Sequence, residues 1–324
     1  MVMHNVADNR NRLEKCSGGR RHQLLVLIIA SLSLVASLAL PVLTIEQQFW
    51  IVLIPIGIFG LSHGGADPMI LKTLTTTTSV GVIAVMCAYV LASLMFITLI
   101  WALPIVALLA FLSLSVWHFG YTDEAFLSPT KTPLLRWLAG SMPILGPMLG
   151  HPHQTGELFA WLIKLDAAQV VGMLVWLGPA LAVLWVLAFG CLLFSNSKRP
   201  DLRVFAELLL VGAALIALPP LLSFALYFCV IHSVRHFLSI AEHRLLAHQK
   251  RPSLTLFPAR KILPATLIAI AMAGIAWIAI VFLEPASNML IEAVRVMFWA
   301  LAALTLPHTI IVRLWWNRES NRIL

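Results

Sequence analysis

Val230-Ile231-His232-Ser233-Val234-Arg235-His236 is the stretch on which the prediction of the fold depends. It follows an almost wholly apolar run from Leu221 to Cys229, and its two histidines stand four residues apart. Residues at this spacing lie on one face of a helix about a turn apart, so both imidazoles can reach one metal ion. Ionisable side chains inside apolar helices are costly and usually functional. The stretch therefore predicts a membrane helix that carries two ligands of a metal site.

The composition is that of a membrane protein. Of 324 residues, 60% are hydrophobic and 11% are charged, and the mean hydropathy is +0.92. Soluble domains are about half apolar and about a quarter charged. The apolar runs are continuous rather than alternating, which argues against a transmembrane barrel. The net charge of +8 is not accompanied by a nucleic-acid motif, so it indicates basic cytoplasmic loops and no nucleic-acid partner. Four scattered cysteines without a CxxC pair argue against a disulfide framework.

We predict an all-α polytopic membrane bundle of about ten helices, or eight or nine if two short segments are re-entrant or merged. A basic cytoplasmic tail covers residues 1–22, a single transmembrane catalytic domain covers 23–314, and a cytoplasmic C-terminal tail covers 315–324. The predicted spans, of which the fifth and seventh are the short ones, are Leu24–Leu43, Phe49–Leu71, Val80–Trp101, Leu103–Tyr121, Leu134–Gly150, Gln169–Phe194, Val204–Leu218, Leu221–Leu238, Ile262–Leu283 and Met289–Leu314.

The distribution of basic residues predicts the orientation. With ten spans and a cytoplasmic N-terminus, all of the 22 Lys and Arg residues except Lys164 and Arg295 fall in the tails, in cytoplasmic loops or at cytoplasmic helix ends. Such a bias follows the positive-inside rule. We therefore expect a multi-pass protein of the inner cell membrane, in contact with lipid, with both termini in the cytoplasm.

Histidines recur at the cytoplasmic ends of the even-numbered spans. The spans concerned are the second, fourth, eighth and tenth, and the residues are His63, His118, His232, His236 and His308. A single histidine near a helix end is usually a hydrogen-bonded interfacial residue, and His308 could simply serve a kink at Pro307. Four separate helices aiming imidazoles at one depth instead indicate a site. We predict His63, His118, His232 and His236 as metal ligands and catalytic residues, a donor set that suits iron, copper or zinc.

Further residues are assigned to the surroundings of this site. Metal-bound imidazoles need their second nitrogen held by a carboxylate or carbonyl. We therefore expect second-shell partners at Asp67, Asp123, Arg235 and His308. Aromatic residues near the histidines could line a narrow apolar tunnel for substrate: Trp117, Phe119, Tyr121, Tyr227 and Phe228. His4, His22, His151 and His153 are expected to be solvated, whereas His243 and His248 are expected at the membrane interface.

These motifs resemble the Brp/Blh family of membrane β-carotene 15,15'-dioxygenases. The resemblance rests on His63-Gly64 followed by Asp67, and on Trp117-His118-Phe119-Gly120 followed by Asp123. It rests also on His232-x-x-Arg235-His236 and on Pro307-His308. Each motif is short, but the four occur in the family's order, from about Phe49 to His308.

The resemblance implies an Fe(2+) enzyme that cleaves the central double bond of β-carotene with O2 to give two molecules of all-trans-retinal. It implies that His63, His118, His232 and His236 bind the iron, and it links the product to a retinal-binding rhodopsin. A hydrocarbon substrate dissolved in the bilayer is best met at membrane depth, behind walls that exclude water.

Other functions fit parts of the pattern. A membrane desaturase or hydroxylase needs several histidine boxes for two irons, whereas the chain has one HxxxH and no HxxHH. A proton or ion transporter could use a histidine relay with Asp67, Asp123 and Arg235, but the predicted outer half holds little charge. A b-type haem protein stays open on spacing alone. An opsin is disfavoured because no lysine lies at mid-membrane.

Overall fold

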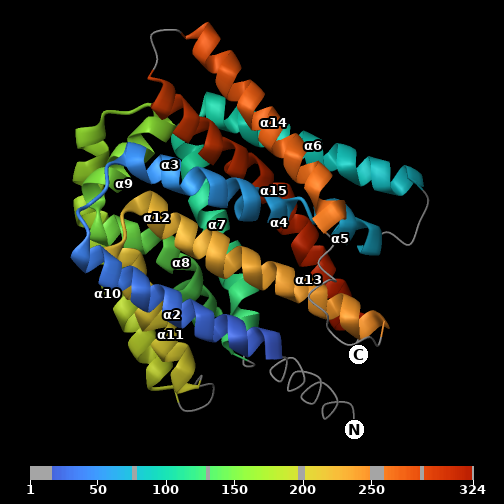
Figure 1. The fold of residues 1–324 in the computed structure, drawn as a ribbon, viewed down its shortest axis with the longest axis horizontal. Coiled ribbons are helices and arrows are strands. Elements are labelled where there is room, and N and C mark those ends of the chain that lie inside the picture. Colours follow the sequence, from blue (N-terminus) through green and yellow to red (C-terminus); the bar gives the residue numbers. More distant parts are fainter. Residues whose placement is uncertain are drawn as a thin grey trace. The chain divides into compact units, whose positions relative to one another are not determined.

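The computed structural model describes residues 17–74, 79–128, 132–195, 201–248, 259–284 and 288–322, and every regular element in these ranges is helical (Figure 1). Seven of the described helices are long and apolar enough to cross a membrane, by length and composition. The predicted all-α polytopic membrane bundle is thereby confirmed. The seven spans are Arg21–Ala39, Gly81–Ala102, Pro104–Glu124, Ala167–Leu193, Pro220–Ile240, Ile262–Leu283 and Met289–Asn317.

The three other predicted spans form helices of a different kind. Leu134–Gly150 and Val204–Leu218 correspond to helices of 18 and 16 residues. The predicted span Phe49–Leu71 is divided among four elements, Ile45–Pro55, Ile56–Gly60, Leu61–Gly64 and Asp67–Leu74. The first two together form the continuous apolar helix Ile45–Gly60. Pro55 cannot donate a backbone hydrogen bond, which favours a change of helix type there, and a turn at Gly65 and Ala66 ends the segment.

Contacts divide the chain into two compact units, whose segments interleave along the sequence. Unit 1 consists of Met1–Pro55, Ser115–Ala160 and Leu165–Arg244. Its helices, including the end of α7 and most of α9, are α2 (Ser17–Ala39), α3 (Ile45–Pro55), α7 (Pro104–Leu127), α8 (Pro133–Gly150), α9 (Pro152–Ile163), α10 (Ala167–Leu193), α11 (Leu202–Ala217), α12 (Pro220–Ala225), the π-helix η2 (Leu226–His232) and α13 (Ser233–His248).

Unit 2 consists of Ile56–Leu114, Trp161–Lys164 and Leu245–Leu324. Besides the first part of α7, it contains the π-helix η1 (Ile56–Gly60), α4 (Leu61–Gly64), α5 (Asp67–Leu74), α6 (Ser79–Ala102), α14 (Ala259–Leu283) and α15 (Met289–Arg322). Helix α15 packs against α5, α6 and α14 (Figure 1). An apolar cluster of Phe96, Ile100, Ala107 and Ala302 joins α15 to α6 and to the start of α7.

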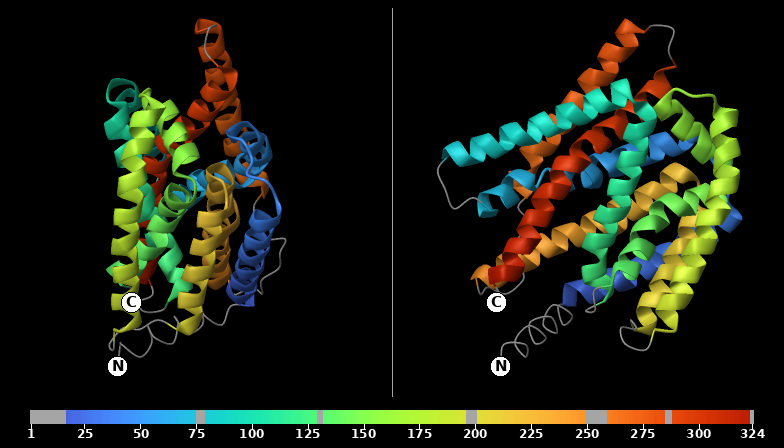
Figure 2. Two further views of the ribbon diagram at one scale, coloured as in Figure 1. Left: turned by 90° about the vertical axis from the view of Figure 1, so that its left-hand side faces the viewer. Right: turned by 180° about the vertical axis from the view of Figure 1, so that it is seen from behind.

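Unit 1 is built around the helical segment that contains the stretch from Val230 to His236. Within the span Pro220–Ile240, 67% of an 18-residue apolar stretch is buried, against at most 39% of the corresponding stretch in each of the other six spans. Helix α8 packs against α10 and α11, and α11 packs against α2 (Figure 2). A helix that is apolar all round and mostly buried belongs to a core rather than to a lipid-facing surface.

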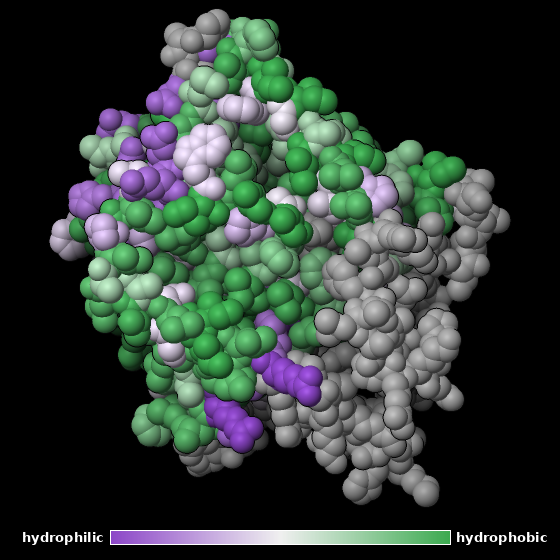
Figure 3. Space-filling view, viewed as in Figure 1, coloured by the Kyte–Doolittle hydropathy of each residue, from purple (hydrophilic) through white to green (hydrophobic). Residues whose placement is uncertain are grey.

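The described outer surface is largely apolar, as the face in Figure 3 shows. Exposed large hydrophobic side chains include Leu32 on α2, Leu91 on α6, Val186 on α10 and Ile275 on α14. A soluble protein rarely exposes such a continuous apolar area, whereas lipid tails solvate it.

Two glycines allow α7 and α8 to approach closely. A Cβ atom added at Gly120 would collide with the backbone carbonyl of Arg136, and one added at Gly140 would collide with the carbonyl of Val116. Backbones come this close in membrane helices where small residues form the contact. Because His118 and Asp123 lie on the same part of α7, this contact positions them within unit 1.

A matched pair of substitutions tests this contact. Gly140→Ala should lower the thermal midpoint of the detergent-solubilised protein, because the added methyl group forces α8 away from α7. Gly274→Ala on α14 should leave the midpoint unchanged or raise it, because nothing lies within 4 Å of the added Cβ and alanine favours helix by about 1 kcal/mol. Equal midpoints for the two variants would contradict the proposed role of Gly140.

Candidate functional site

The π-helix η2 brings Tyr227 and His232 onto one face of unit 1. Five residues advance an α-helix by about 140° beyond one full turn, so side chains at this spacing diverge. In a π-helix the hydrogen bonds run over five residues, and here the backbone N–H of Ser233 donates to the carbonyl of Phe228. The hydroxyl of Ser233 donates to the same carbonyl at 2.7 Å. Short π segments are rare and frequently lie at functional sites.

Asp123 contacts the side chains of both Tyr227 and His232. The hydroxyl of Tyr227 donates to Oδ2 of Asp123 at 2.6 Å, and Nδ1 of His232 lies 3.5 Å from Oδ1. Thr122 Oγ1 lies 3.3 Å from the same Nδ1. All four side chains are buried. The carboxylate of Asp123 therefore faces Nδ1 of His232, which leaves Nε2 on the opposite side of the ring.

His118 lies beside His232. Their ring centroids are 5.0 Å apart and the rings are nearly perpendicular, at 71°. His232 is also enclosed by Phe119 at 4.6 Å and by Phe228 at 6.2 Å between centroids. His236, one helical turn further along, is 2% exposed. The structure thus places three of the predicted ligands in the buried interior of unit 1, and it brings two of them into contact.

A buried charge cluster surrounds Asp123. The guanidinium of Arg235 forms an ion pair with Glu207 on α11, and its NH1 atom lies 3.6 Å from Oδ2 of Asp123. Glu207 also accepts a hydrogen bond of 2.8 Å from Gln23 on α2. Two carboxylates and one guanidinium leave a net charge of −1 on these three residues. Because such a charge is costly in an apolar interior, it favours a cation next to Asp123, at His232.

His22 was expected to be solvated, and this is wrong. It is buried, and its Nε2 lies 3.1 Å from the carbonyl of Val230 in η2. A π-helix shifts backbone hydrogen bonds out of the regular α pattern, which gives a neighbouring helix a carbonyl to bind. His22 and Gln23 together attach α2 to the elements that carry the site.

Unit 2 contains a second carboxylate–histidine pair. Nδ1 of His308 lies 2.8 Å from Oδ1 of Asp67, and the hydroxyl of Tyr89 donates to Oδ2 of Asp67 at 2.9 Å. Asp67 and His308 are both buried. His63 belongs to α4 in this unit, immediately after η1, but its side chain lies outside the described residues. Of the two π-helices in the described ranges, η2 contains the predicted ligand His232, and η1 ends three residues before the predicted ligand His63.

The donor set of unit 1 fits a transition-metal ion. Two imidazoles on one ion, with bonds of about 2.1 Å, have ring centroids roughly 5 Å apart, which agrees with the spacing of His118 and His232. A carboxylate on Nδ1 is the usual partner of a metal-bound histidine. Among the described side chains, no three His, Cys, Asp or Glu residues form a group able to hold an ion. The described part of the site therefore amounts to a pair of imidazoles with one oriented ring.

The aromatic residues assigned to a tunnel lie in two different settings. Phe119, Tyr227 and Phe228 are buried against His232 or Asp123. Trp117 is 43% exposed and stacks on Tyr121, with ring centroids 5.8 Å apart. The guanidinium of Arg136 lies 5.2 Å from the centroid of the Tyr121 ring. Among the described side chains, the aromatic contacts to His232 and Asp123 come from the first group.

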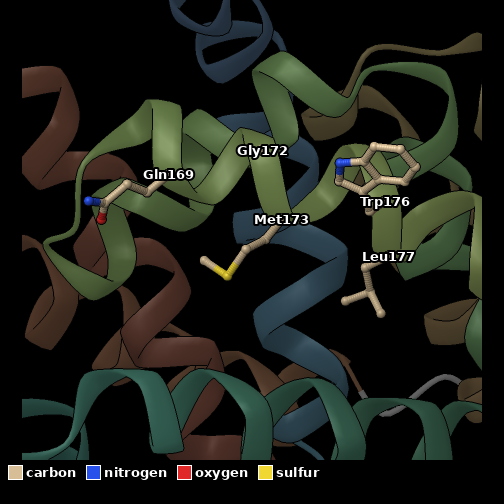
Figure 4. A pocket seen from close by; sticks show the side chains of 5 residues that line it. All are labelled: Gln169, Gly172, Met173, Trp176 and Leu177. Carbon is tan, nitrogen blue, oxygen red and sulfur yellow. The ribbon is translucent and has the colours of Figure 1, made fainter.

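An open groove lies elsewhere in unit 1, along α10. It is lined by Gln169, Gly172, Met173, Trp176 and Leu177 (Figure 4). None of these side chains titrates or binds metals readily, and Met173 and Leu177 project from one side of the helix. The groove is a surface depression without reactive groups.

Polar residues that the sequence analysis did not assign also contribute to these contacts, among them His22, Gln23, Tyr89, Thr122 and Glu207. Glu207 carried a usable signal, because it is a lone acidic residue in the apolar run from Val204 to Leu218. The partners of Tyr89 and Gln23 lie 22 and 184 residues away in the sequence. No local pattern identifies such pairs.

Comparison with known proteins shows the family to which the chain belongs. The family model described as "Beta-carotene 15,15'-dioxygenase" matches residues 54–316. The chain is 26% identical over 283 residues to "Beta-carotene 15,15'-dioxygenase" of the uncultured marine bacterium 66A03, covering 85% of this chain and 96% of that protein. It is 28% identical over 297 residues to "Probable beta-carotene 15,15'-dioxygenase Blh" of Halobacterium salinarum, covering 81% and 82%. No solved structure matches. With a match over most of its length, the chain belongs to the β-carotene 15,15'-dioxygenase family.

Proposed function

We propose that this protein is an iron-dependent membrane oxygenase that cleaves the central 15,15' double bond of β-carotene with O2 and releases two molecules of all-trans-retinal. The reaction balances without another reductant, since the double bond breaks and each of its carbons takes one oxygen atom. The observation that carries the proposal is the pair of His118 and His232, with Asp123 facing Nδ1 of His232. Family membership supplies the substrate class.

His118, His232 and His236 are the proposed iron ligands of unit 1. Bound iron would supply the activation of O2, which imidazole ligands permit because they leave open coordination positions. The carboxylate of Asp123, 3.5 Å from Nδ1, would orient the ring of His232 with Nε2 toward the ion. Tyr227 and Arg235 in turn hold Asp123. The prediction that His63 supplies a fourth imidazole stays a prediction from the sequence.

The apolar surroundings suit the proposed substrate. Phe119 and Phe228 pack around His232, and such a wall excludes water from reactive oxygen chemistry. The large exposed apolar surface keeps the protein in the bilayer, where a carotenoid dissolves. We place the protein in the inner cell membrane with both termini in the cytoplasm, on the basis of the distribution of Lys and Arg.

Expression in a bacterial host that accumulates β-carotene tests the reaction. The cells should lose their orange colour and accumulate retinal, measured by chromatography of extracted pigments. A host expressing His232→Ala to the same level should stay orange. Longer apocarotenals in place of retinal would contradict cleavage at the central bond, and unchanged β-carotene would contradict the activity.

Single alanine substitutions test the ligands. His118→Ala, His232→Ala and His236→Ala should each lower bound iron in the purified protein to about a tenth or less, measured by elemental analysis, and should abolish retinal formation. The physical reason is the loss of one of a few nitrogen donors. If His63 is the fourth ligand, His63→Ala should show the same loss of bound iron and of retinal formation.

His151→Ala is the matched control for these variants. His151 is a partly buried histidine whose Nε2 lies 3.2 Å from the carbonyl of Ala217, and its replacement should leave iron and activity near the wild-type level. Membrane insertion should be equal in all variants, measured by fractionation. A His118 or His232 variant that keeps full iron and activity would show that the ligand assignment is wrong.

A further inference from the structure

Asp67 joins three helices of unit 2 through its two carboxylate oxygens. It is the first residue of α5, it is 1% exposed, and it contacts Tyr89 of α6 and His308 of α15. Helix α15 packs directly against α5 and α6. The two contacts have normal hydrogen-bond lengths of 2.9 and 2.8 Å. One buried carboxylate therefore determines how the side chains of two neighbouring helices are oriented.

Packing alone does not account for a carboxylate in this place. Burial of an ionised carboxylate is costly unless a cation or several donors offset it. Among the described residues, Asp67 has no Lys or Arg in ion-pair contact, and its ion-pair partner is His308. The start of α5 contributes a favourable helix dipole, which is worth about 1 kcal/mol. A histidine that served only the backbone next to Pro307 would need no buried acid beside it, because backbone carbonyls could accept its hydrogen bond.

Unit 1 contains the same arrangement of a tyrosine, an aspartate and a histidine. There Tyr227 donates to Oδ2 of Asp123, and Oδ1 of Asp123 faces Nδ1 of His232. In unit 1 the tyrosine and the histidine come from one π-helix, whereas in unit 2 they come from α6 and α15. Different local structures thus build one Tyr–Asp–His arrangement twice. This recurrence indicates that the arrangement serves the imidazole rather than a particular helix contact.

The chemistry of the arrangement is specific. A carboxylate that accepts a hydrogen bond from Nδ1–H of an imidazole favours the tautomer whose lone pair is on Nε2. The same hydrogen bond raises the basicity of Nε2. A tyrosine hydroxyl on the second oxygen prevents the carboxylate from rotating. The result is an oriented imidazole whose Nε2 is prepared to bind a metal ion.

We propose that His308 is a metal-binding imidazole and that Tyr89 is a positioning residue that acts on it through Asp67. This proposal rests on the proposed iron-dependent function. It assigns to His308 a role beyond that of the second-shell partner expected from the sequence, and it gives Tyr89 a role that no motif indicated.

Metal affinity and spectroscopy test this role without relying on turnover. Purified full-length protein is titrated with Fe(II) against a competing chelator, and its visible absorption is recorded after substitution with Co(II). Tyr89→Phe should weaken Fe(II) binding about 10-fold and Asp67→Asn about 10- to 100-fold, as for other partners of metal-bound histidines. His308→Gly should change the Co(II) spectrum, and added imidazole should restore it.

Matched controls separate positioning from general damage. Thr305→Val removes a hydroxyl from α15 that bonds only within its own helix, to the carbonyl of Leu301. Asp166→Asn removes the charge of an exposed carboxylate that caps α10. Both should keep wild-type metal affinity. If His308→Gly does not fold, Tyr89→Phe decides, because it removes one oxygen atom and keeps the ring.

The outcomes distinguish this proposal from the one on which it rests. Wild-type protein that binds no iron would overturn both. Wild-type protein that binds iron and loses it in the His118 and His232 variants, but keeps wild-type affinity and spectrum in the Tyr89, Asp67 and His308 variants, would overturn only the role of His308. Weakened binding in Tyr89→Phe, together with rescue of His308→Gly by imidazole, would support it.

Discussion

A carboxylate buried among apolar helices has to be satisfied by the groups around it, and this constraint governs both units. Water is not available inside a membrane bundle to compensate an unpaired charge. Asp123 meets the constraint with Tyr227, His232 and Arg235, and Asp67 meets it with Tyr89 and His308. Each acid therefore ties several helices together. The contacts that satisfy each carboxylate also orient an imidazole, so the packing of these helices and the orientation of His232 and His308 depend on the same atoms.

The sequence predicts the fold class and most of the spans, and it identifies several of the ionisable residues that the structure shows buried inside them. The apolar runs are long, and their histidines and aspartates stand out because ionisable residues are rare in such helices. Asp67 and Asp123 were expected to hold imidazoles from their positions shortly after His63 and His118. The structure shows the carboxylates beside other rings, those of His308 and His232. Spacing along one helix identifies candidates, but it does not say which ring of a neighbouring helix each acid meets.

Other features had no local signal. Periodicity treats a helix as regular, so neither η1 nor η2 could be predicted, and the relation between Tyr227 and His232 was missed with them. Glu207 and Gln23 contact each other across 184 residues, which requires knowledge of how α2 and α11 pack. His22 was judged by its polar neighbours in the sequence, whereas its position is determined by the carbonyl of Val230. These errors share one cause, since each concerns a contact between helices rather than a property of one helix.

The π-helix η2 has a consequence for how this core can vary. A π segment accommodates about one residue more per turn than the α-helix on either side. The π segment therefore changes the angle, about the helix axis, between the side chains of α12 and those of α13. Substitutions that repack Leu221 or Ser223 on α12 need not turn Arg235 and His236 on α13. Loss of a single residue between 226 and 232 would couple the two faces again and would rotate one of them by about 100°. Length in this seven-residue segment is thus more constrained than the identity of the apolar residues that precede it.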